Sequence, residues 1–125
     1  MRYPVPLVVW ALLIFIGSSI PAASFPNSPI FTYDKALHAG VFFVFALLTE
    51  RALRHQARYH FLALHSRSIT LLIAIVYGAL DEFHQWFVPG RIPDVFDLIA
   101  DTAGAVLFLI VLWLIQSKRR RENPA

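Results

Sequence analysis

Residues 95–116 read VFDLIADTAGAVLFLIVLWLIQ, and this stretch decides the fold class of the chain. The hydrocarbon core of a membrane is about 30 Å thick, and roughly 20 consecutive, mainly apolar helical residues are needed to cross it. The stretch is long and apolar enough, and Asp94, which follows Pro93, is suited to cap the N-terminus of a helix. We therefore predict a transmembrane helix over residues 95–116.

Three more apolar stretches are expected to cross the same membrane, at about residues 5–20, 35–53 and 68–88. The composition agrees, because 58% of the 125 residues are hydrophobic and 15% are charged. Soluble domains carry about 25% charged residues. We predict an all-α polytopic membrane protein, in which residues 1–125 form a single domain built as a bundle of four transmembrane helices. The chain has no cysteine, which excludes disulfides, thiolate metal ligands and cysteine nucleophiles.

The basic residues predict how the bundle is oriented. Nine of the eleven lie at the N-terminus, between the second and third stretches, or in the tail: Arg2, Arg51, Arg54, Arg58, Arg67, Lys118, Arg119, Arg120 and Arg121. An excess of Lys and Arg marks the cytoplasmic side, so we expect a multi-pass inner-membrane protein with both termini in the cytoplasm. The alternative is that residues 1–23 are a signal peptide cleaved after Ala23, which would leave three spans. The run Arg119–Arg121 is too short, and lacks the interleaved aromatic residues, for a nucleic-acid partner.

Polar residues recur at helical spacing in three of the four predicted spans. Three pairs are separated by four residues and therefore share a helix face: Asp34 with His38, Asp81 with Gln85, and Asp97 with Asp101. All three faces lie near the outer ends of their helices, and at 1.5 Å per residue Asp81 and Asp101 are each about 10 Å below those ends. We predict that they meet in one polar site at the outer leaflet. Nearby glycines are expected to let the helices approach closely, and these are Gly40, Gly78 and Gly104.

Two interpretations of this polar site stay open. In the structural one, a buried hydrogen-bonded network fixes helix packing, and Lys35 and Arg91 neutralise some of the acids. In the functional one, the site is open to the outer leaflet or periplasm, because six carboxylates outnumber these two bases and the excess must be protonated, bind a cation or meet a ligand. The sequence does not show whether Glu82 faces the site, since it lies about 100° around the helix from Asp81.

The candidate residues divide by role. The candidate catalytic residues are Asp81, Glu82 and His84, and the candidate substrate-binding residues are Asp34, Lys35, His38, Gln85, Arg91, Asp94, Asp97 and Asp101. Histidines and aspartates are suitable metal ligands, but no spacing matches a motif such as His-Glu-x-x-His, so we assign no metal ligand. The sequence identifies no cofactor and no oligomeric state.

Two motifs at these residues resemble the VanZ-like family of small bacterial membrane proteins. The first is the segment DKALHAG at residues 34–40, and the second is DEFHQWFVPGR at residues 81–91, which continues to Asp94, Asp97, Asp101 and Gly104. Many members of the family have Asn at the position of Asp101 and a second glycine at that of Phe108. Asp101 thus puts a negative charge where the family has a neutral amide, and Phe108 is expected to loosen close helix packing. The family takes its name from a protein associated with teicoplanin resistance. The resemblance therefore implies a site on the cell-envelope side of the membrane.

Three functions follow as hypotheses. The first is binding of an envelope lipid, a glycolipid or a lipid-linked cell-wall precursor, with a link to glycopeptide resistance; Arg91 and Lys35 would hold a phosphate. The second is an enzyme that acts on a lipid-linked substrate, with Asp81 or Glu82 as general base and His84 or His38 as acid. The third is a small proton-coupled transporter, which the clustering of the acids on one side disfavours.

Overall fold

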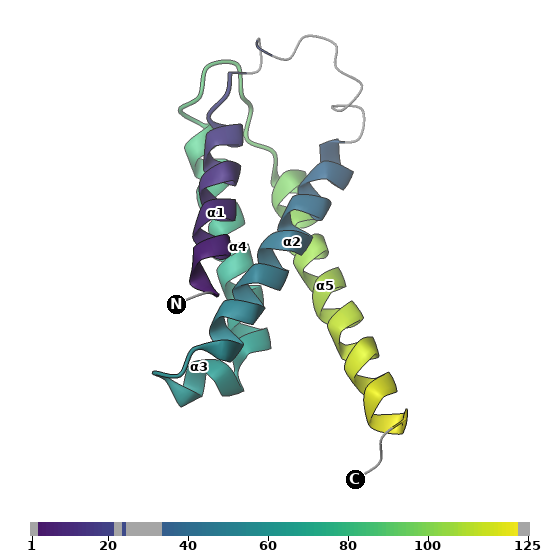
Figure 1. Ribbon diagram of the computed structural model, residues 1–125. Coiled ribbons are helices and arrows are strands. Elements are labelled where there is room, and N and C mark those ends of the chain that lie inside the picture. The colour runs from purple at the N-terminus through teal and green to yellow at the C-terminus, as the bar shows by residue number, and fades with distance from the viewer. Residues whose placement is uncertain (1–2, 22–23, 25–33, 123–125) are drawn as a thin grey trace.

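A computed structural model describes residues 3–21, 24 and 34–122 of the chain (Figure 1). Arg2, the alternative cleavage site at Ala22–Ala23 and most of the predicted outer loop lie outside the described residues. The described part contains five helices and no strand: α1 Pro4–Ser18, α2 Asp34–His55, α3 His60–Leu64, α4 Ser66–Gln85 and α5 Val95–Glu122. The all-α prediction is therefore confirmed.

Two of the helices, α2 and α5, are long and apolar enough to cross a membrane. α1 is apolar but has 15 residues, which makes it shorter than a typical span. α4 has 20 residues, and its last turns carry Asp81, Glu82, His84 and Gln85, which make this end of the helix polar. Four crossings and the position of the termini relative to the membrane thus remain predictions.

The helices pack around α2. Figure 1 shows α2 and α5 crossing each other, with α1 and α4 lying side by side, and α5 running away from the other helices towards its C-terminus. The core consists of side chains from α2, α4 and α5: Phe42, Phe45, Ala46, Ala74, Ala105 and Phe108. Phe108 is buried and meets Phe43 edge to face, with ring centroids 5.6 Å apart, so this position fills the core where a glycine would leave space.

Two aromatic side chains attach α1 to the bundle through backbone carbonyls. The indole nitrogen Nε1 of Trp10 donates a hydrogen bond to the carbonyl of Val41 in α2 at 3.1 Å. The hydroxyl of Tyr77 in α4 donates to the carbonyl of Ala11 at 2.6 Å. Many of the remaining α1 side chains are exposed, so these bonds help to fix the helix where apolar packing alone does not.

Glycine permits a close approach of backbones where α2 crosses α5. A Cβ built on Gly104 would lie 2.0 Å from the carbonyl oxygen of Ala39, and one on Gly78 would lie 3.0 Å from Oδ2 of Asp101. A Cβ on Gly40 would meet nothing within 4 Å. The expected close approach of backbones is therefore present at Gly104 and absent at Gly40, whereas Gly78 of α4 packs against the side chains of Leu98 and Asp101 in α5.

We expect Gly104→Ala to destabilise the protein, because the added methyl group would overlap the backbone of Ala39 and separate α2 from α5. Overpacking of this kind costs about 1–3 kcal/mol, and a backbone atom has less room to yield than a side chain. Thermal unfolding in mild detergent should show a lower Tm than for Gly40→Ala, the matched control. Equal Tm values for the two variants would contradict the close contact.

Candidate functional site

Lys35 links the first turn of α2 to the start of α5. Its Nζ donates hydrogen bonds to Asp94 Oδ2 at 2.6 Å and to the buried carboxylate of Asp97, and it lies 3.4 Å from Asp34 Oδ2. The hydrogen bond from Lys35 holds the pKa of Asp94 below its ordinary value, and the bond that Asp94 Oδ1 accepts from the amide of Phe96 acts in the same direction. That second bond also confirms Asp94 as a capping residue of α5. One ammonium thus supplies the counter-charge for several acids.

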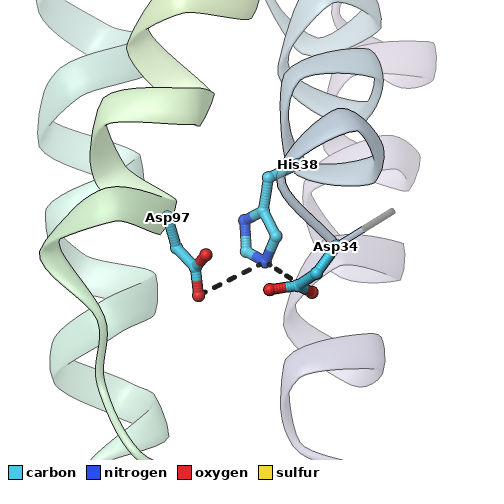
Figure 2. A group of neighbouring side chains, drawn as sticks. All are labelled: Asp34, His38 and Asp97. Atoms are coloured by element: carbon cyan, nitrogen blue, oxygen red, sulfur yellow. Dashed lines mark ion pairs between the residues drawn. The ribbon is translucent and has the colours of Figure 1, made fainter. Parts of the chain in front are cut away.

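His38 connects the same two helices one turn deeper. Its Nδ1 lies 2.9 Å from Oδ1 of Asp101, a residue that is fully buried. Its Nε2 lies 3.7 Å from Asp97 Oδ2 and 3.9 Å from Asp34 Oδ1, and Figure 2 shows the ring between these two carboxylates. A carboxylate on Nδ1 holds an imidazole in one tautomer and orientation, which leaves Nε2 available to a ligand or a proton.

Asp34, His38 and Asp97 also have the geometry of a metal-binding group. Each offers a ligand atom, and these atoms lie within 4.8 Å of one another. However, Lys35 already contacts both aspartates. Because its ammonium provides the positive charge at this point, we assign no metal ion to the group.

The polar residues at the end of α4 point in three directions. Asp81 and Gln85 are both buried, and Nε2 of Gln85 donates to Oδ2 of Asp81 at 3.1 Å. Glu82 faces α5, where its Oε2 accepts the backbone N–H of Asp94 at 2.8 Å. His84 faces α1. Its Nε2 atom lies 2.9 Å from the hydroxyl oxygen of Ser19, and the centroid of its ring lies 4.5 Å from the ring centroid of Phe15. The three candidate catalytic residues therefore do not share one surface.

Arg91 binds the C-terminal end of α1 instead of an acid. Its Nε donates to the carbonyl of Ile20 at 3.2 Å, and Nη2 donates to that of Gly17 at 3.3 Å. A cation is favoured there, because the carbonyls at a helix C-terminus carry partial negative charge. The chain reaches this position through a turn at Gly90, whose φ of 75° is one that glycine adopts readily.

A cavity of about 420 Å³ lies between α1, α2 and α4. Its apolar wall consists of Trp10, Leu13, Ile14, Leu37, Val41 and Phe42. Its polar wall consists of Asp34, His38, Asp81, Gln85 and Arg91, with Gly17 and Ser18 from α1. The volume falls within the range of about 300–1,000 Å³ that is usual for small-molecule sites. The residues of α1 were not predicted, since an apolar helix with small residues gives no signal of a binding site in the sequence.

The structure thus separates the predicted residues into two neighbouring groups. The first joins α2 to α5 and contains Lys35, His38, Asp94, Asp97 and Asp101. The second lines the cavity and contains Asp34, His38, Asp81, Gln85 and Arg91. Whether either group binds a ligand stays a prediction.

A buried acid at the opposite end of α2 was not predicted. Glu50 is 5% exposed, and its Oε1 lies 3.4 Å both from Nε of Arg54 and from the hydroxyl of Ser66. Phe45 and Tyr77 stack with ring centroids 4.8 Å apart, and along α2 and α4 they lie between Glu50 and Ser66 on one side and His38 and Asp81 on the other. Among the described residues, no hydrogen bond or ion pair links Glu50 to the polar groups at the other end of α2.

Comparisons with known proteins identify the same family as the two sequence motifs. The model of the VanZ/LLP1 family matches residues 5–116. An uncharacterized protein of Schizosaccharomyces pombe is 33% identical over 118 residues, which represent 94% of this chain and 67% of the yeast protein. No solved structure matches the chain.

Proposed function

The chain belongs to the VanZ/LLP1 family, and on that premise we propose that it binds an envelope lipid in the cavity between α1, α2 and α4. The cavity carries the proposal, because it combines an apolar wall for a hydrocarbon chain with a polar wall for a headgroup. Trp10, Leu37 and Phe42 would contact the chain. Asp34, Asp81 and Gln85 would form hydrogen bonds with hydroxyl or amine groups of the headgroup.

We further propose that α1, α2, α4 and α5 cross the bacterial inner membrane, with both termini in the cytoplasm. The reason is the charge distribution, because Arg51, Arg54 and Lys118 are on one side of the predicted spans, where basic residues mark the cytoplasm.

Because the chain has no cysteine, single cysteines can be introduced at Arg58, Arg91 and Ser117. A membrane-impermeant maleimide added to intact cells should label position 91 alone. Labelling at 58 or 117 would contradict this orientation.

Blocking the cavity should reduce lipid retention. Gly17 lines the cavity, and a Cβ at this position meets nothing within 4 Å, so Gly17→Leu adds volume without a clash at that atom. We expect native mass spectrometry of the purified variant to show at least a fivefold loss of retained lipid relative to wild type. Gly40→Leu is the matched control, since Gly40 is equally open and does not line the cavity. Equal retention by wild type and Gly17→Leu would count against the proposed site.

A second candidate function, acid–base catalysis on a lipid-linked substrate, is favoured by one observation. His38 lines the cavity, and its Nδ1 is held by the fully buried Asp101. An imidazole fixed by a carboxylate is the usual arrangement of a general base. This gives His38 the role of general base, which the sequence suggested for Asp81 or Glu82, whereas the sequence suggested His38 as an acid.

The catalytic candidate predicts a chemical change in the lipid. Incubation of wild-type protein with a total lipid extract should yield a new species by mass spectrometry, and His38→Gln should abolish it, since loss of a general base costs about 10²–10⁴-fold in rate. His84→Gln is the control, because His84 faces α1 and does not line the cavity. An unchanged lipid extract would count against catalysis and would not affect the binding proposal.

A further inference from the structure

We propose that the cavity selects a lipid whose headgroup carries a primary ammonium, and that Asp81 is the residue that pairs with it. The inference rests on the proposed function, because it concerns the same cavity and adds the charge of its occupant. It differs from the expectation that Arg91 and Lys35 hold a phosphate.

The carboxylate of Asp81 lacks a counter-charge. Asp81 is 7% exposed, and within the described part of the chain its side chain accepts one hydrogen bond, from the neutral amide of Gln85. Among the described residues, no lysine, arginine or histidine nitrogen lies within 4.0 Å of it. A buried carboxylate without a cation is unfavourable, above all inside a membrane protein. A ligand that brings its own cation would remove that cost.

The other buried aspartates near the site each contact a basic side chain. Asp97 binds Lys35, and Oδ1 of Asp101 binds His38, while Oδ2 of Asp101 is buried with no hydrogen-bond partner among the described residues. Glu82 also lacks a cation among the described residues, but it accepts the amide of Asp94 and does not line the cavity. Asp81 is therefore the buried acid that both lines the cavity and lacks a cation in the described part of the chain.

The bases near the cavity are already engaged. Lys35 contacts three aspartates, and Arg91 donates to the carbonyls of Gly17 and Ile20. A headgroup with only negative charge would meet the carboxylates of Asp34 and Asp81 on the cavity wall. A primary ammonium has three N–H donors and fits a wall of carboxylate and amide oxygens. Charge complementarity thus favours an aminolipid.

The test compares two lipids with the same chains and different headgroup charge. Full-length protein in mild detergent is mixed with equal amounts of palmitoyl-oleoyl phosphatidylethanolamine and palmitoyl-oleoyl phosphatidylglycerol, and adducts are counted by native mass spectrometry. We expect wild type to carry about tenfold more phosphatidylethanolamine than phosphatidylglycerol, because a hydrogen bond between charged groups has an effect of about this size on affinity. Asp81→Asn should remove the preference. Glu50→Gln should keep it, since Glu50 is similarly buried and lies away from the cavity.

The possible results separate the two proposals. Saturable and equal binding of both lipids by wild type would overturn the selectivity and leave the proposed function standing. Absence of saturable binding of either lipid would overturn both. A preference that persists in Asp81→Asn would overturn the role of Asp81. If Asp81→Asn does not fold, wild type is tested instead with N-acetylated phosphatidylethanolamine, because acetylation removes the positive charge of the headgroup. Binding of this lipid as tight as that of phosphatidylethanolamine would contradict the inference.

Discussion

The polar contact between α2 and α5 determines where the other parts of this protein lie. Lys35 and His38 extend from α2 towards Asp94, Asp97 and Asp101 on α5. The buried carboxylates of Asp97 and Asp101 would be unfavourable without partners in an apolar environment, and Lys35 and His38 each supply one. The contact therefore fixes the register of the two helices. The crossing with Gly104 against Ala39 follows just below it.

Once this crossing is fixed, α4 and α1 complete the site. Gly78 of α4 packs against Asp101, which brings Asp81 and Gln85 to the same depth as His38. α1 is then held through Tyr77, Trp10 and Arg91, all of which donate to backbone carbonyls. Leu7, Ala11 and Ile14 of α1 also pack against the core. Near the polar end of the bundle, the cavity separates α1 from α2 and α4.

The sequence predicted the helices better than the neighbours of their side chains. Apolar length located α1, α2, α4 and α5, and the spacing of four residues correctly paired Asp81 with Gln85. Spacing does not tell which helix lies on each side of α4. Glu82 is about 100° from Asp81 and faces α5, whereas His84 is about 60° away on the other side and faces α1. The wall formed by α1 could not be predicted, since no polar pattern marks it.

The shortness of α1 has a consequence for the surrounding bilayer. Its 15 residues extend about 22 Å, and the hydrocarbon core is about 30 Å thick. On the four-span proposal, this hydrophobic mismatch thins the adjacent bilayer, at a cost of fractions of a kcal/mol per Å. Thinning draws lipid headgroups inward beside the helix that forms one wall of the cavity. The lipid next to α1 would then already be displaced part of the way towards the depth of Asp81 before any binding takes place.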